Sequence, residues 1–221
     1  MIPARRPRLL PAAVLFVAAL AAFAWVASAL EATGRPLGSL DAWAASWLHP
    51  LARPWLTDAM LVISFIGAPS TLTAVAAVVC LILLRRRGYG KSIELITLVL
   101  GGNLLNVGLK HLIHRGRPEL DPLVALTSYS FPSGHAMAST VFYGFALPCL
   151  LADPPRRAVA VAAGILLIAL VGLSRVYLGV HYASDVIGGI LEAVAWSTLM
   201  PTVWRLAGEH RRDTGSRTDP E

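Results

Sequence analysis

The chain has 221 residues, of which 56% are hydrophobic and only 14% charged, and its mean hydropathy is +0.63. This composition excludes an ordinary soluble domain and indicates a single integral membrane domain. The net charge of +6 does not indicate a nucleic-acid-binding protein, because the basic residues form short clusters between apolar runs and no continuous stripe. Both cysteines, Cys80 and Cys149, lie within apolar runs, where we expect neither a disulfide nor a metal site.

The first predicted element is an apolar run over residues 9–30, preceded by a tail at 1–8 that carries three arginines. A secretory signal has an apolar core of about 7–15 residues, whereas a membrane span requires about 20. The run therefore predicts an uncleaved first transmembrane helix. The small residues Ala27, Ser28 and Ala29 leave a cleaved signal peptide as the alternative.

Residues 31–55 form a polar connection in which Trp43, Trp47 and Trp55 stand among charged and proline residues. Tryptophan gathers at the level of the lipid headgroups. We therefore expect this segment to lie along the membrane interface, either as a short amphipathic helix or as an ordinary loop.

The rest of the chain predicts five further spans. The apolar region 56–84 is interrupted at Gly67, Ala68 and Pro69, which predicts a short leading helix and a second span from about Pro69, because proline is tolerated at a helix start. The remaining predicted spans are 92–112, 133–151, one that ends near Ser174, and 181–204. The prediction is thus an all-α, six-helix membrane domain over residues 9–206, with polar cytoplasmic tails at 1–8 and 207–221.

The distribution of basic residues predicts the orientation of these spans. With a cytoplasmic N-terminus, most of the 19 lysines and arginines fall on the cytoplasmic side, including the cluster Arg85–Arg87. The positive-inside rule favours this arrangement, with both termini cytoplasmic. The outer side then receives the polar ends of spans three to six.

Three polar motifs lie at these outer ends, from Lys110 to Pro118, from Pro132 to His135, and from Ser174 to Asp185. The pattern K-x6-R-P, P-S-G-H and S-R-x5-H-x3-D resembles the three-part signature of the type 2 phosphatidic acid phosphatase family. That family also includes bacterial lipid-pyrophosphate phosphatases and soluble vanadium haloperoxidases. Each motif alone is a weak signal, but the three together, in this order, are specific. The resemblance implies a helical bundle of the PAP2/haloperoxidase type that hydrolyses a lipid phosphate or pyrophosphate.

His181 and Asp185 are the candidate nucleophile and its partner. Because they are four residues apart, they lie on one helical face if the sixth helix has already begun. The carboxylate can then accept the Nδ1 proton of His181 and leave Nε2 free to attack phosphorus. The resemblance implies the same roles, with a phosphohistidine intermediate, although the pair in isolation is equally compatible with a structural contact.

Ser133, Gly134 and His135 predict a phosphate-binding helix start. Ser133 is the expected N-cap, and unpaired backbone N–H groups at a helix start attract phosphate. Glycine removes the side chain that would keep a ligand away. His135 is placed to protonate the leaving oxygen as general acid, which is also the role that the resemblance implies.

Lys110, Arg117 and Arg175 are the candidate phosphate-binding cations, because fixed positive charges neutralise the oxygens of a transferring phosphoryl group. We expect other cations on the outer side to extend toward lipid headgroups instead, namely Arg35, Arg53 and Arg115. His111 and His114 occupy free positions of the first motif and receive no catalytic role. Neither a carboxylate cluster nor a compact histidine set is present, so no metal and no cofactor is expected.

The preferred function is a metal-independent phosphatase acting on polyprenyl (undecaprenyl-type) pyrophosphate at the outer face of a bacterial cell membrane. The choice of lipid is by analogy with small members of the family. Phosphatidylglycerol phosphate or phosphatidic acid is the alternative substrate. The other class considered is a lipid-phosphate binding or transport protein, but the chain shows no inverted repeat. Vanadate-dependent oxidation is disfavoured because the related oxidases are soluble. The expected partners are the lipid substrate and membrane lipids, without nucleic acid.

Overall fold

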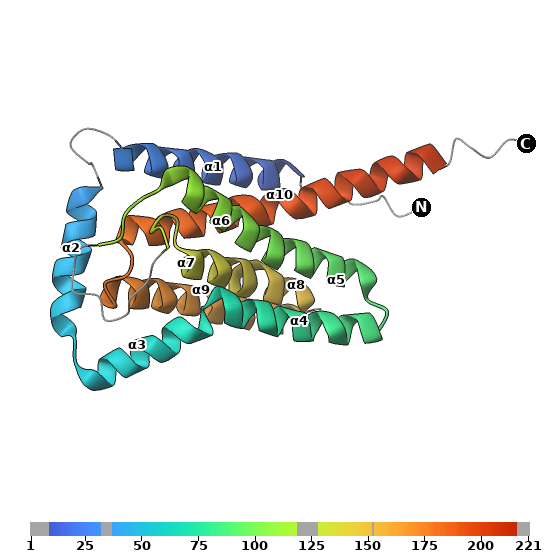
Figure 1. Cartoon of the computed structure of the whole chain (residues 1–221). Coiled ribbons are helices and arrows are strands. Elements are labelled where there is room, and N and C mark those ends of the chain that lie inside the picture. The colour runs from blue at the N-terminus through green and yellow to red at the C-terminus, as the bar shows by residue number, and fades with distance from the viewer. Residues whose placement is uncertain (1–8, 32–36, 119–127, 152, 216–221) are drawn as a thin grey trace, which may run out of the picture.

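The computed structural model describes residues 9–31, 37–118, 128–151 and 153–215, and these residues form helices and no strand (Figure 1). The prediction of an all-α fold is confirmed. The first part of the chain contains α1 (Leu9–Glu31), α2 (Gly38–Leu48), the 3₁₀ turn η1 (His49–Leu51), α3 (Pro54–Ile66) and α4 (Pro69–Arg85). The second part contains α5 (Tyr89–Ile96), the π-helical segment η2 (Thr97–Gly101), α6 (Gly102–Ile113), α7 (Gly134–Ser139), the π-helical segment η3 (Thr140–Ala146), α8 (Leu147–Leu150), α9 (Pro154–Tyr177) and α10 (Ala183–Gly215).

Four of the described helices are long and apolar enough to cross a membrane. They cover Leu10–Leu30, Tyr89–Ile113, Pro154–Tyr177 and Ala183–Trp204. A fifth candidate is the pair α3 and α4, which bends by 44°. The helix α4 starts at Pro69, as the sequence predicts, whereas α3 starts at Pro54, inside the segment predicted as a polar connection. The predicted count of six spans stays a prediction.

The segment predicted as the fourth span consists of α7, η3 and α8, which contain six, seven and four residues. Together these are 17 residues, at the short end of the roughly 17–25 residues of a membrane span. The segment occupies the middle of the bundle, where α4, α6, α9 and α10 contact it. Its side chains from Ala136 to Phe142 are all buried, so it forms the core around which the longer helices pack.

The predicted interfacial segment is a helix. In Figure 1, α2 runs across one end of the bundle, nearly perpendicular to the long helices. Its Trp43 and Trp47 are exposed, whereas Asp41 and Ala44 on its other face are buried against the bundle. The helix therefore turns its tryptophans outward and its charged Asp41 toward the bundle.

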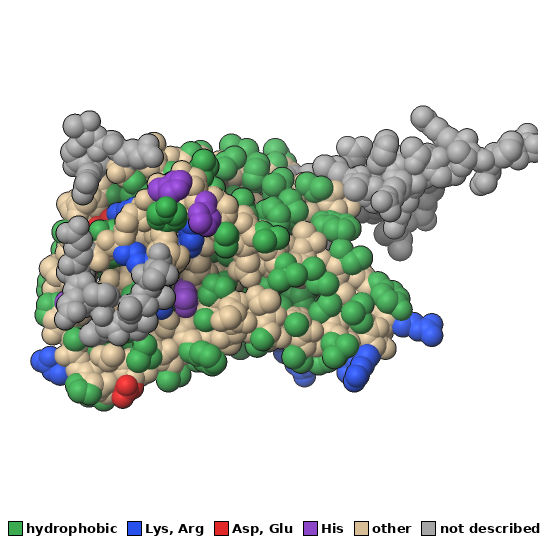
Figure 2. Space-filling view, in the orientation of Figure 1, with side chains coloured by type: hydrophobic (Ala, Val, Ile, Leu, Met, Phe, Trp, Pro, Cys, Tyr) green, Lys and Arg blue, Asp and Glu red, His purple; other side chains and the backbone are tan. Residues whose placement is uncertain are grey.

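The outer surface of the bundle is mostly apolar, with large exposed side chains such as Leu104, Leu112 and Val159. Figure 2 shows this apolar surface together with a polar end, where histidines gather, and an opposite end that carries lysines and arginines. The arginine cluster 85–87 follows α4 at that opposite end. An apolar belt between two polar ends is the surface that a bilayer requires.

Candidate active site

The three motifs meet at the polar end of the bundle. The first begins in the last turn of α6, the second begins α7, and the third joins α9 to α10. A cavity of about 770 Å³ lies between them, and its lining includes the motif residues Lys110, Arg117, Gly134, His135, Arg175 and His181. The other two predicted residues are fully buried: Ser133 directly precedes Gly134, and Asp185 contacts His181.

His181 precedes the last helix instead of opening it. The helix α10 begins at Ala183, so His181 belongs to the connection after α9, and Asp185 lies in the first turn of α10. Nδ1 of His181 is nevertheless 3.3 Å from Oδ2 of Asp185. Burial lowers the pKa of His181 to about 4, although Asp185 opposes this effect. The imidazole is therefore neutral at pH 7, and with Nδ1–H donating to Asp185, Nε2 keeps a free lone pair.

Asp185 is held on both of its carboxylate oxygens. Besides His181, Oδ2 accepts hydrogen bonds from the Tyr182 backbone N–H at 2.9 Å and from the Ser130 hydroxyl. Oδ1 accepts a hydrogen bond from Arg115 Nη1 at 2.5 Å. An acidic residue at the third position of a helix that accepts from the N-cap N–H is half of a capping box, so Asp185 also fixes the start of α10.

Arg115 departs from the prediction that it extends toward lipid headgroups. Its guanidinium turns inward and bridges Asp185 and Asp41, with Nη2 at 2.8 Å from Asp41 Oδ2. Two carboxylates next to one planar guanidinium provide a better set of acceptors than water does. Asp41 lies 74 residues earlier in the chain, and no spacing rule connects the two.

Ser133 stands at the N-cap position of α7, as predicted, but its hydroxyl makes no capping hydrogen bond. Within the described residues its buried Oγ has no hydrogen-bond partner. The Gly134 backbone follows directly and faces the cavity, and a Cβ there would lie 3.0 Å from Asn106 Oδ1. Glycine is therefore required by the close approach of α6 as well as by access to a ligand.

The helix α10 packs closely against this turn, and Gly189→Ala is expected to disturb it. An added Cβ would lie 2.4 Å from the Ser133 carbonyl oxygen, so either the turn or α10 must move. Overpacking of this kind lowers the free energy of unfolding by about 1–3 kcal/mol. Because either movement changes the position of Ser133 relative to α10, we expect phosphate release to slow by at least about ten-fold.

The matched control is Gly108→Ala in α6, where an added Cβ meets no atom within 4 Å. Thermal unfolding in detergent and phosphate release are measured for both variants. If the two glycine variants match each other in both measurements, the close approach of α10 to Ser133 does not constrain the site.

The three predicted cations reach the cavity from different elements, and each is anchored. Lys110 Nζ donates to the Tyr129 carbonyl at 2.8 Å, and Arg117 Nη1 donates to the Val180 carbonyl at 2.5 Å. Arg175 is 4% exposed and donates through Nη1 to the Ser64 hydroxyl, while its Nε has no partner among the described residues. Fixed cations of this kind need no reorganisation when a phosphate arrives.

Asn106 and Glu192 support the floor of the cavity, and sequence reasoning did not identify Glu192. Asn106 Nδ2 donates to Glu192 Oε2 at 2.7 Å and to the Pro132 carbonyl at 3.4 Å. Asn106 therefore connects α6 to the second motif as well as to Glu192. The only signal for Glu192 is a carboxylate inside an apolar helix.

Comparison with known proteins agrees with this geometry. The profile of the PAP2 superfamily matches residues 91–208. Phosphatidylglycerophosphatase B of Bacillus subtilis is 38% identical over 144 residues, which cover 63% of this chain and 70% of that protein. Lipid A 1-phosphatase of Rhizobium johnstonii is 35% identical over 117 residues, which cover 48% of this chain and 44% of that protein.

A solved structure has the same fold. The crystal structure of a transmembrane PAP2 type phosphatidylglycerolphosphate phosphatase from Bacillus subtilis superposes with a TM-score of 0.78 at 28% sequence identity. The superposition covers 86% of this chain and 96% of that one, so it extends into the part of the chain that precedes the matched profile. The chain therefore belongs to the PAP2 superfamily and is a phosphoric ester hydrolase of the membrane.

Proposed function

We propose that the chain hydrolyses a lipid phosphate, with phosphatidylglycerol phosphate as the substrate. The names of the Bacillus subtilis relative and of the solved structure both refer to this lipid, which supports the alternative from the sequence over polyprenyl pyrophosphate. The sequence preference for polyprenyl pyrophosphate came from analogy and from no residue of the chain. The tail-binding surfaces that separate these lipids are not part of the three motifs.

The observation that carries the proposal is the pairing of a neutral His181 with Asp185 beside anchored cations in one cavity. In the proposed first step, Nε2 of His181 attacks phosphorus and the bond from phosphorus to the lipid oxygen breaks. The negative charge of the bound phosphate favours the protonated form of His135, which donates its proton to that leaving oxygen. Lys110, Arg117 and Arg175 neutralise the phosphoryl oxygens. Asp185 stabilises the imidazolium of the resulting phosphohistidine.

In the proposed second step, water attacks the phosphohistidine and restores the enzyme. His135, now neutral, takes a proton from that water, while the bond from phosphorus to His181 breaks and inorganic phosphate leaves. Ser133 Oγ and the Gly134 N–H hold phosphoryl oxygens throughout, because both groups lie at the start of α7. No step requires a metal ion, since the charges of the chain supply the neutralisation.

The proposed setting is a bacterial cell membrane that six segments cross, with the cavity at the outer face and both termini cytoplasmic. Two observations support this orientation. The arginine cluster 85–87 lies at the end of the bundle opposite the motifs, and the positive-inside rule assigns such a cluster to the cytoplasm. The three exposed tryptophans of residues 43–55 lie at the same end of the bundle as the three motifs, where lipid headgroups would surround them.

The test is phosphate release by the purified protein in detergent with EDTA present. The substrates are phosphatidylglycerol phosphate, phosphatidic acid, a polyprenyl pyrophosphate and glycerol 3-phosphate, with His181→Ala as the blank. We expect kcat/KM for phosphatidylglycerol phosphate to exceed that for the other substrates by at least about ten-fold, which corresponds to about 1.4 kcal/mol of preferential transition-state binding. We also expect inhibition by vanadate, which resembles the pentacoordinate phosphorus.

Each outcome separates one part of the proposal. Phosphate release no faster than the blank from every lipid would overturn the phosphatase assignment. Fastest release from the polyprenyl pyrophosphate would overturn only the substrate. Activity that disappears in EDTA and returns with Mg²⁺ would overturn the metal-independent mechanism.

A further inference from the structure

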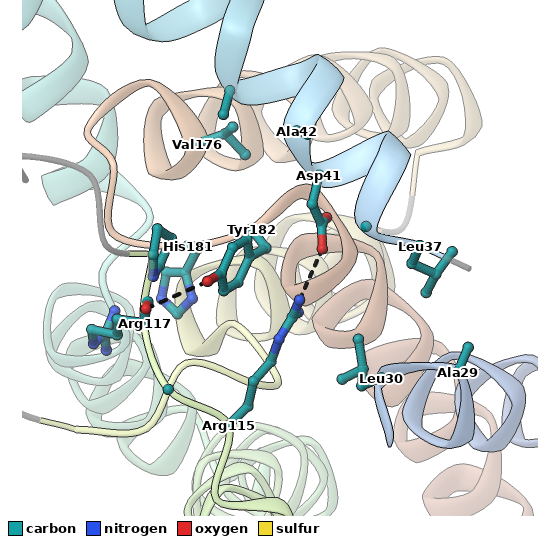
Figure 3. A pocket seen from close by; sticks show the side chains of 14 residues that line it. Ala29, Leu30, Leu37, Asp41, Ala42, Arg115, Arg117, Val176, His181 and Tyr182 are labelled. Carbon is teal, nitrogen blue, oxygen red and sulfur yellow. Dashed lines mark hydrogen bonds and ion pairs between the residues drawn. The ribbon is translucent and has the colours of Figure 1, made fainter. Parts of the chain in front are cut away.

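A chain of contacts between ionisable side chains runs from α2 to the candidate nucleophile. His181 contacts Asp185, Asp185 contacts Arg115, and Arg115 contacts Asp41, at 3.3, 2.5 and 2.8 Å. Figure 3 shows Arg115 reaching from its loop to Asp41 of α2 across a second cavity, whose lining also includes His181. This cavity has a volume of about 590 Å³ and shares Arg117 and His181 with the catalytic one.

Arg115 determines how the Asp185 carboxylate is turned. A carboxylate held on one oxygen can rotate about the bond between Cβ and Cγ. Arg115 holds Oδ1, so the plane of the group is fixed and Oδ2 faces Nδ1 of His181. The Asp185 side chain is fully buried, which shields its oxygens from bulk water.

Asp41 in turn fixes Arg115 and the first turn of α10. Oδ2 of Asp41 accepts from Arg115 and from the Ser184 hydroxyl, and Oδ1 accepts from the Ser184 backbone N–H at 2.9 Å. The Arg115 guanidinium also lies 4.0 Å from the centre of the Tyr182 ring. Asp41 is 6% exposed, so its charge was removed from water to make these contacts.

The arrangement has an electrostatic consequence for the reaction. When Nε2 attacks phosphorus, His181 acquires a positive charge, which the guanidinium of Arg115 would oppose. Asp41 offsets that guanidinium, so Arg115 can orient Asp185 without weakening its attraction for the imidazolium. The sum of Asp41, Arg115 and Asp185 is one negative charge beside the nucleophile.

We propose that Asp41 and Arg115 are positioning residues for the reaction, which orient Asp185 and through it the nucleophile His181. The inference rests on the proposed role of His181. It extends the active site to α2, since Asp41 precedes the residues 91–208 that match the superfamily profile. Neither residue was predicted to belong to the site.

The experiment compares Asp41→Asn, Arg115→Met and the double variant with wild type in detergent. For each protein, kcat, KM, vanadate inhibition and thermal unfolding are measured on the best lipid substrate. We expect kcat to fall by about 10-fold in Asp41→Asn and by about 100-fold in Arg115→Met, with KM and vanadate inhibition within about two-fold of wild type. Arg115→Lys should recover part of the loss, because it keeps a cation without the planar fork.

The double variant distinguishes positioning from independent support of the fold. If Asp41 acts through Arg115, adding Asp41→Asn to Arg115→Met costs less than about two-fold more in kcat. The matched controls are Asp58→Asn in α3 and Arg86→Met after α4, both exposed and expected to behave as wild type.

Three outcomes would overturn the inference while the phosphatase assignment stands. The first is an Asp41→Asn variant that is as active as Asp58→Asn. The second is a loss of kcat in the double variant that equals the product of the two single losses. The third is a fall in vanadate affinity and melting temperature that parallels the fall in kcat. A wild-type protein that releases no phosphate from any lipid would overturn the proposed function itself, and this inference with it.

Discussion

His181→Ala is expected to reduce phosphate release by at least about 10⁴-fold, because the covalent route disappears when its nucleophile is removed. The remaining cations and the α7 turn can still bind a phosphate, so vanadate should still bind the variant. A folded protein that binds the inhibitor without turnover separates loss of the nucleophile from loss of the site. Phosphate release under saturating lipid and vanadate binding by calorimetry provide the two measurements.

The matched control for this prediction is His111→Ala. His111 lines the same cavity and is exposed, but it has no role in the proposed mechanism. His181→Asn is a second variant for the case that the alanine protein unfolds, because an amide can keep a hydrogen bond to Asp185. Activity above about 1% of wild type in both His181 variants would show that water attacks the lipid phosphate directly.

His135→Ala is expected to have an effect that depends on the leaving group. A lipid alkoxide leaves poorly without a proton, so removing the general acid should slow the turnover of phosphatidylglycerol phosphate by about 10²–10⁴-fold. An aryl phosphate such as p-nitrophenyl phosphate releases a stable phenolate without protonation. Its first step should survive in the variant, while the second step, which needs His135 as base, should not.

The measurement is a rapid-mixing experiment with the aryl phosphate and His135→Ala. We expect a burst of nitrophenolate close to one equivalent per active site, followed by a slow steady rate, and a phosphorylated protein that is stable to alkali and labile to acid. Equal losses of turnover for the lipid and the aryl substrate, without a burst, would contradict the general-acid role. His111→Ala again serves as the control and should show wild-type kinetics.

The contacts of the site that were predictable from the sequence are those between residues close together in the chain. The offsets from Lys110 to Arg117 and from His181 to Asp185 are short, and helix ends place them with little freedom. A charge pattern was enough to predict that three distant motifs share one end of the bundle. The His181–Asp185 contact forms even though α10 begins two residues later than predicted, because the capping geometry of Asp185 brings the pair together.

The parts that were not predictable depend on tertiary contacts. Arg115 had a plausible surface role, and only the position of α2 shows that Asp41 meets it. The segment Gly134–Leu150 has the hydropathy of a span, but its length and its place inside the bundle follow from packing by its neighbours. We expect the choice of lipid to depend on cavity walls formed by several helices. The predicted preference for polyprenyl pyrophosphate was therefore not based on any residue of the chain.

The backbone N–H of Ser133 donates a hydrogen bond to the carbonyl oxygen of Asp185 at 2.9 Å. This bond joins the proposed phosphate-binding turn to the residue that contacts the proposed nucleophile, although the two are far apart in the chain. In the proposed mechanism, the spacing between the attacking nitrogen and the bound phosphorus is therefore set before a lipid arrives. The binding free energy of the lipid tail is then not needed to bring the reacting groups together. All of this free energy can contribute to holding the substrate and to selecting among lipid tails.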